Sequence, residues 1–146
     1  LRYREDEFVG ENDQVYRVRY RLTLTGPVKE HEFEKSVFLS RSRFIAPATH
    51  SIRFYREYFK PTSELNIEKD RLRWLIRYEG QEIFLNIDRL IKPQMEGCFL
   101  ELKSRTWSRY DAERKAKLIL LLLEDLGVRD AEPVHEEYMD MAMERE

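Results

Sequence analysis

Cysteine is nearly absent from this chain, and its shortage excludes two common ways of stabilising a small protein. Cys98 is the single cysteine among 146 residues, so no disulfide can form within the chain. A cysteine-rich zinc site is excluded for the same reason. An unpaired thiol is typical of proteins from a reducing compartment, and we therefore expect a cytoplasmic location.

Long hydrophobic runs are also lacking. The longest apolar stretch covers residues 118–123 and lies between Lys117 and Glu124. A helix that crosses a bilayer needs about 20 apolar residues, so this stretch predicts part of a buried helix, and we expect no membrane partner. Hydrophobic residues nevertheless make up 42% of the chain and aromatic residues 12%, which is enough for one folded domain.

Charge is close to balance overall, at a formal net charge of −2, but it is unevenly distributed. Residues 129–146 hold seven acidic and two basic side chains, which leaves this segment at −5 and residues 1–128 at +3. So small a surplus disfavours a nucleic-acid partner, yet it allows a local cationic pocket. We expect one domain over residues 1–128, followed by an acidic C-terminal tail over residues 129–146.

Alternation of apolar and polar residues predicts strands through much of the chain. The predicted strands cover residues 1–5, 15–25, 30–39, 65–78, 82–88 and 98–104. Between them, the spacing of Ile52, Tyr55 and Phe59 predicts a helix within residues 40–63, although the aromatic density of this stretch would also suit a strand. The sequence therefore predicts an α+β fold.

Two further helices are expected near the C-terminus. The first begins after Ser108 or Asp111, which are good N-caps, and ends near Leu126, before Gly127. The second is a short docking helix in the acidic tail, around Tyr138 and three methionines.

Several predicted strands carry charge on one face and apolar side chains on the other. An open sandwich would leave the charged faces in water, whereas a closed barrel would gather them in its lumen. Guanidinium groups fit phosphate oxygens, and carboxylates bind Mg²⁺ or Mn²⁺. In a barrel the lumen would be lined by Arg2, Arg4, Arg17, Arg19, Arg21, Lys69, Arg71 and Arg73, together with Glu32, Glu34, Asp88 and Glu101.

The order of six short motifs resembles the CYTH domains, also called triphosphate tunnel metalloenzymes. This family includes thiamine triphosphatases, inorganic triphosphatases and class IV adenylate cyclases. The motifs are residues 1–4 (LRYR), 21–27 (RLTLTGP), 32–34 (EFE), 68–74 (EKDRLRW), 85–88 (LNID) and 97–102 (GCFLEL). They are similar to the family's Leu-Arg-x-Arg, Leu-Thr-x-Lys-Gly-Pro, Glu-x-Glu, Lys-x-Arg-x-x-aromatic, aspartate-bearing and Gly-x-Phe-x-Glu strands. The resemblance covers nearly all of residues 1–128.

This resemblance implies a largely antiparallel β-barrel whose tunnel is surrounded by peripheral helices and a C-terminal helix. It also implies a metal-dependent triphosphatase whose ligand is a nucleotide, inorganic triphosphate or polyphosphate and whose cofactor is Mg²⁺ or Mn²⁺. The expected phosphate-binding residues are Arg2, Arg4, Arg19, Arg21, Lys69, Arg71, Arg73 and Lys103, and the expected metal ligands are Glu32, Glu34, Asp88 and Glu101.

Three departures from the family pattern leave other functions open. The family's first strand, Glu-x-Glu-x-Lys, has no counterpart, and Thr25 stands where the family has a lysine. Lys103 stands where a second glutamate usually follows Glu101, so we expect it to bind phosphate rather than metal. A non-catalytic phosphate-binding or regulatory module is therefore the main alternative. A class IV adenylate cyclase-like enzyme is a further one, although no base pocket is evident from the residues.

The chain begins at Leu1 without an initiator methionine, and we expect it to be a fragment or a processed product. A homodimer and a domain upstream of Leu1 both remain open.

Overall fold

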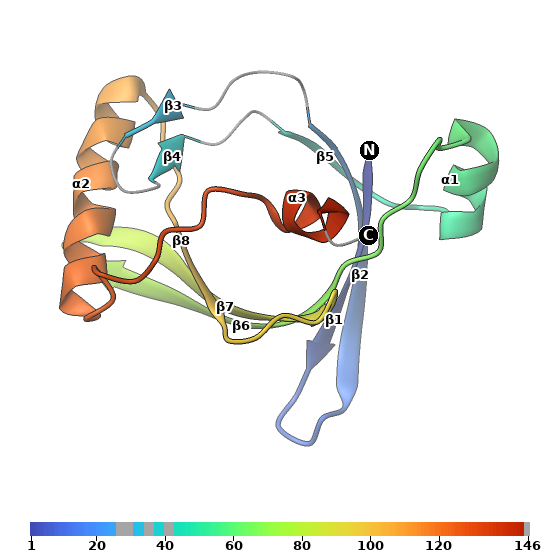
Figure 1. The fold of residues 1–146 in the computed structure, drawn as a ribbon, viewed down its shortest axis with the longest axis horizontal. Helices are drawn as coiled ribbons and strands as arrows, with labels where there is room; N and C mark the ends of the chain where they lie inside the picture. The colour runs from blue at the N-terminus through green and yellow to red at the C-terminus, as the bar shows by residue number, and fades with distance from the viewer. Residues whose placement is uncertain (26–30, 34–36, 40–42, 145–146) are drawn as a thin grey trace. The chain divides into compact units, whose positions relative to one another are not determined.

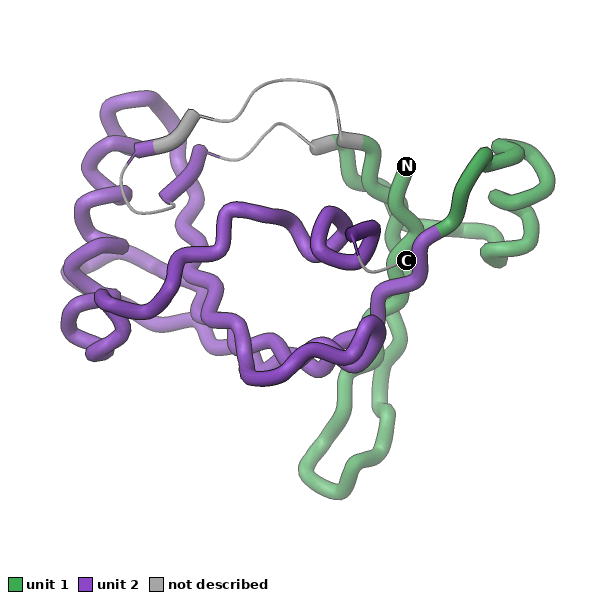
Figure 2. Tube along the Cα trace, in the orientation of Figure 1, with its two compact units in different colours: residues 1–30, 40–64 green, residues 31–39, 65–146 purple. Residues whose placement is uncertain are grey.

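The computed structural model describes residues 1–25, 31–33, 37–39 and 43–144 of the chain. Its strands pair in three antiparallel sheets, two of three strands and one of two, and helices complete an α+β architecture (Figure 1). Contacts divide the chain into two compact units (Figure 2). Unit 1 comprises residues 1–30 and 40–64, and unit 2 comprises residues 31–39 and 65–146.

Unit 1 combines a sheet with one short helix. Strands β1 (Arg2–Val9), β2 (Val15–Thr25) and β5 (Arg43–Pro47) pair in the order β1-β2-β5, and helix α1 covers Ile52–Phe59. The alternating sequence of β1 and β2 sends arginines to one face and the tyrosines Tyr3 and Tyr20 to the other. On this tyrosine face Tyr3 contacts Tyr20 and the buried Tyr55 of α1, with ring centroids 6.2 and 5.7 Å apart. This aromatic cluster packs α1 against the sheet.

Unit 2 is built around an antiparallel meander. Strands β6 (Glu68–Tyr78), β7 (Gln81–Lys92) and β8 (Phe99–Lys103) pair in the order β6-β7-β8. Glu79 and Gly80 join β6 to β7 with φ values of 46° and 72°, the left-handed backbone that a two-residue hairpin turn needs at both positions. The short pair β3 (His31–Glu32) and β4 (Phe38–Leu39) also belongs to unit 2.

Two helices complete unit 2. Helix α2 (Arg109–Asp125) is capped by Ser108, whose side chain accepts a hydrogen bond from the Asp111 amide at 3.1 Å. It lies at the β6–β7 turn, where the Tyr78 hydroxyl donates to Asp125 at 2.6 Å. Helix α3 (Tyr138–Met143) lies over one face of the β6-β7-β8 sheet (Figure 1). No helix in the described part of the chain has the length and apolar character that a membrane span requires.

The α+β class is confirmed, and so are the helices predicted around residues 52–59, after Ser108 and in the acidic tail. The closed barrel stays unconfirmed, because the strands of the described residues form separate open sheets. The single strand predicted over residues 30–39 is wrong: β3 pairs with β4, so the chain turns back within that segment. Strand β5 lies within the range in which a helix was predicted; Phe44 and Ile45 favour a strand there, and β5 pairs with β2.

Candidate functional site

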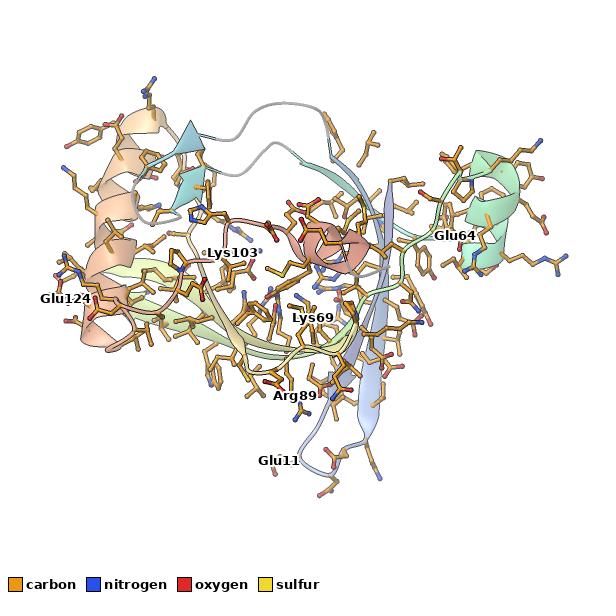
Figure 3. All side chains as sticks on the ribbon, in the orientation of Figure 1. Glu11, Glu64, Lys69, Arg89, Lys103 and Glu124 are labelled. Atoms are coloured by element: carbon orange, nitrogen blue, oxygen red, sulfur yellow. The ribbon has the colours of Figure 1, made fainter. Side chains whose placement is uncertain are left out.

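Strand pairing in unit 2 brings charged side chains from three strands to one face of the sheet. Arg71 lies opposite Asp88, Arg73 opposite Asn86, and Asn86 opposite Glu101. Because side chains alternate along a strand, Lys69 and Lys103 share this face. Figure 3 shows Lys69 and Lys103 on the side of the sheet where α3 lies and Arg89 on the opposite side. We call this surface the β6–β8 cationic face; it consists of Lys69, Arg71, Arg73, Asn86, Asp88, Glu101 and Lys103.

Asp88 is the centre of this face and is fully buried. Its carboxylate accepts hydrogen bonds from the Lys69 ammonium at 2.6 Å and from two nitrogens of Arg71 at 2.5 and 2.6 Å. The Tyr138 hydroxyl of α3 donates a further bond at 2.8 Å. Burial by itself would raise the pKa of Asp88, but the hydrogen bonds from Arg71, Lys69 and Tyr138 prevail and lower this pKa to about 2. Asp88 therefore stays ionised at neutral pH.

Glu101 extends the network to β8. Its carboxylate accepts hydrogen bonds from Arg71 at 2.9 Å and from the Asn86 amide at 3.0 Å, and it forms an ion pair with Lys103 at 2.7 Å. Burial would raise the pKa of Glu101, but Lys103, Arg71 and Asn86 together hold it below its usual value. Asn86 is fully buried and joins Glu101 to Arg73, whose Nε donates to the amide oxygen at 2.8 Å. The network thus fixes the cations in place along β6.

The β6–β8 cationic face carries more positive than negative charge. Lys69, Arg71, Arg73 and Lys103 stand against the two carboxylates of Asp88 and Glu101. Burial lowers the pKa of Lys69 to about 8, and the neighbouring Arg71 adds a smaller lowering against the opposing effect of Asp88. An anion placed beside these groups would relieve their repulsion.

Unit 1 contains a second group of cations on one sheet face, the β1–β2 arginine face, formed by Arg2, Arg4, Asp6, Phe8, Arg17, Arg19 and Arg21. Asp6 accepts hydrogen bonds from Arg4 at 2.6 Å, from Arg19 at 3.0 and 3.2 Å, and from Arg21 at 2.8 Å. Burial would raise the pKa of Asp6, but the guanidinium groups lower it. One carboxylate therefore binds three arginines, and among the described residues of this face the arginines outnumber the acidic side chains.

Two details of the arginine face bear on ligand binding. The guanidinium carbons of Arg17 and Arg19 lie 5.3 and 5.1 Å from the centre of the Phe8 ring, within the range of cation–π contacts. The Nε of Arg21 is buried and has no hydrogen-bond partner among the residues that the structure describes. A buried donor without a partner is costly, so this atom favours an additional acceptor.

The structure thus places the expected phosphate-binding residues on one sheet face in each of the two units. Unit 1 collects Arg2, Arg4, Arg19 and Arg21, and unit 2 collects Lys69, Arg71, Arg73 and Lys103 with Asp88 and Glu101. Of the other two expected metal ligands, Glu34 lies outside the described residues, and only the backbone of Glu32 is described.

Sequence reasoning missed three participants, Asp6, Asn86 and Tyr138. Residues two apart on a strand share a face, so Asp6 lies on the face of Arg2 and Arg4, and Asn86 on the face of Asp88. The alternation of the sequence could therefore have identified both. Tyr138 lies 50 residues from Asp88 along the chain, and no local pattern connects them.

The described residues do not by themselves suit a divalent cation. No three acidic, histidine or cysteine side chains come together among them. Mg²⁺ and Mn²⁺ need several free carboxylate oxygens, whereas the oxygens of Asp88 and Glu101 are already engaged by lysine, arginine, tyrosine and asparagine donors. A metal site that includes Glu32 and Glu34 stays a prediction.

Comparison of the chain with models of protein families, with curated proteins and with solved structures finds no match. The family resemblance therefore stays a prediction, and the geometry of the two faces carries the functional interpretation.

Proposed function

We propose that this chain is a CYTH-like domain that binds the phosphate groups of a nucleotide, inorganic triphosphate or polyphosphate. The observation that carries the proposal is the surplus of cations on the β6–β8 cationic face, held in position by Asp88, Asn86 and Glu101. Arginine forks suit phosphate oxygens, and a network that fixes them before the ligand arrives reduces the entropy lost on binding.

The spacing of the cations favours a ligand with several linked anionic groups. Lys69, Arg71 and Arg73 follow one another at every second residue of β6, which is about 7 Å per step along a strand. A single phosphate can reach one or two of these side chains, whereas a chain of phosphates can contact all of them at once. Each contact after the first is then intramolecular, which raises the affinity.

Hydrolysis is the second step of the proposal. The resemblance implies a largely antiparallel barrel whose tunnel binds Mg²⁺ or Mn²⁺ and whose intact form is a metal-dependent triphosphatase. One observation favours the alternative of a non-catalytic phosphate-binding or regulatory module: Asp88 and Glu101 are both neutralised by protein cations. Binding of the polyanion is common to both functions and is the part that the geometry supports best.

Thermal unfolding in tripolyphosphate tests this proposal. Tripolyphosphate should raise Tm more than sodium chloride at equal ionic strength, since a ligand of the native state stabilises it by mass action. The double variant Arg73→Ala with Lys103→Ala should lose most of the difference. The matched control is Arg89→Ala, which removes one cation from the opposite face of the same sheet, where Arg89 makes an exposed pair with Asp70.

Equal Tm shifts in tripolyphosphate and chloride, or an equal loss in Arg89→Ala, would refute specific binding at the cationic face. Release of inorganic phosphate in the presence of Mn²⁺ then separates the two functions. Turnover supports the triphosphatase, and tight binding without turnover supports the binding module.

A further inference from the structure

Helix α3 contacts one end of the β6–β8 cationic face. The Tyr138 hydroxyl donates to Asp88 at 2.8 Å, and the Lys69 ammonium lies 4.4 Å from the centre of the Tyr138 ring. The same ring meets Phe99 of β8 edge to face, with centroids 5.3 Å apart. Tyr138 therefore lies against Lys69, Asp88 and Phe99 at once.

The rest of α3 is arranged to hold Tyr138 there. Glu137 and Asp140 form a reciprocal capping box that begins the helix, and Met141 and Ala142 are buried. A six-residue helix has little stability of its own in water, so its order depends on this packing. Such a segment can dock and undock as a unit.

An anion that binds at the Lys69 end of the face would compete with α3 for contact with the Lys69 ammonium. Lys69 is only 21% exposed, and its ammonium already contacts the Asp88 carboxylate and the Tyr138 ring. The competitor is tethered: the acidic residues 129–146 follow α2 in the same chain, so the effective concentration of α3 at the sheet is of the order of millimolar. Opposite charge on the tail and on the face adds a general attraction.

We propose that α3 is an autoinhibitory segment that covers the Lys69 end of the β6–β8 cationic face through Tyr138. This inference rests on the proposed anion binding. A polyanion that reaches Lys69 displaces Tyr138 from Asp88 and Lys69. With α3 docked, the Lys69 end of the face is withheld from the ligand. Full engagement of the cationic row requires α3 to leave.

The experiment has one readout that does not depend on ligand binding. Acetylation of Lys69 by a small amine-reactive reagent, followed by mass spectrometry, reports access to its amine. Tyr138→Ala should accelerate this acetylation several-fold, and Tyr138→Phe, which keeps the ring but loses the bond to Asp88, should have a smaller effect. The matched control within α3 is Met143→Ala, whose side chain is 62% exposed and should leave the rate unchanged.

Calorimetric titration with tripolyphosphate at constant pH gives the second readout. Tyr138→Ala should bind about tenfold more tightly than the natural sequence, the size expected when one charge-assisted hydrogen bond and one cation–π contact no longer compete. Circular dichroism establishes that each variant is folded. If Tyr138→Ala unfolds the chain, Tyr138→Phe and deletion of residues 137–146 provide the same comparison.

The outcomes separate this inference from the proposed function. Faster acetylation with tighter tripolyphosphate binding supports both. Faster acetylation with no tripolyphosphate binding in any variant supports α3 as a cover of Lys69 and refutes the anion site. Unchanged acetylation in folded Tyr138→Ala refutes the cover, and weaker tripolyphosphate binding in that variant refutes autoinhibition, because Tyr138 would then assist the ligand.

Discussion

The two charged faces use similar residues with different degrees of burial. Asp6 in unit 1 is bonded to three arginines and keeps 16% of its side chain exposed, while those arginines remain 24–35% exposed. Asp88 in unit 2 is completely buried, and its partners Lys69 and Arg71 are 21% and 15% exposed. Among the residues that the structure describes, the second carboxylate belongs to a continuous network that runs through Arg71 to Glu101 and Asn86.

This comparison shows that burial, rather than the number of ion pairs, sets the strength of the electrostatic effects. Water screens the partly exposed cluster around Asp6, whereas the network around Asp88 lies where screening is weak. Burial by itself would raise the pKa of Asp88, but the hydrogen bonds from Arg71, Lys69 and Tyr138 lower it to about 2. Burial lowers the pKa of Lys69 to about 8. Unit 2 should therefore respond more strongly than unit 1 to loss of a charge.

The largest expected effect is on stability. Asp88→Asn should lower the free energy of unfolding by about 3–5 kcal/mol, because it leaves the largely buried Lys69 without a counter-charge and Arg71 with Glu101 alone. Asp6→Asn should cost about 1 kcal/mol, since its arginines can turn to water. Urea unfolding of the two variants beside the natural sequence measures both values, and equal losses would contradict the role of burial.

A smaller effect is expected in the pH dependence of anion binding. Lys69 is charged below its pKa of about 8 and becomes neutral above it, so tripolyphosphate affinity should be highest below pH 8 and fall by up to about tenfold per pH unit above it. Calorimetric titrations at several pH values between about 7 and 9 measure this fall in tripolyphosphate affinity. Lys69→Met should flatten the profile; comparison with this variant also removes the contribution of titration by the ligand itself. A parallel decline in both proteins would show that Lys69 takes no part.

The smallest expected effect concerns Lys103, which is 47% exposed and paired with Glu101 at 2.7 Å. Lys103→Glu exchanges a phosphate-binding cation for a second carboxylate beside Glu101. It should weaken metal-free tripolyphosphate binding several-fold and strengthen Mn²⁺ binding, as two titrations can show. No change in either affinity would place Lys103 outside the site.

The strand patterns predicted much of this arrangement. The period of two along β6 placed Lys69, Arg71 and Arg73 on one face, and the register of the hairpin sets them against Asp88 and Asn86. The same rule placed Glu101 and Lys103 together, and their ion pair confirms it. Alternation succeeds here because the geometry of a strand is local.

Predictions failed where non-local pairing decides the structure. Strand β5 forms against β2, and although Phe44 and Ile45 favour a strand, the sequence does not show which strand they would pair with. The antiparallel pairing of β3 with β4 is likewise a contact that the pattern of residues 30–39 did not predict. The site residue Tyr138 was missed because its partner Asp88 lies 50 residues away.

The sequence by itself determined the α+β class, the charged and apolar faces of the strands, the capped helix α2 and the presence of a helix in the acidic tail. These features follow from backbone periodicity and local hydrogen bonding, which act over a few residues. Only the tertiary structure decided that Asp88 is buried under Lys69, Arg71 and Tyr138, and that α3 lies on the cationic face. Burial and charge pairing between distant segments depend on how the whole unit packs, and this packing sets the pKa values on which the proposed anion binding depends.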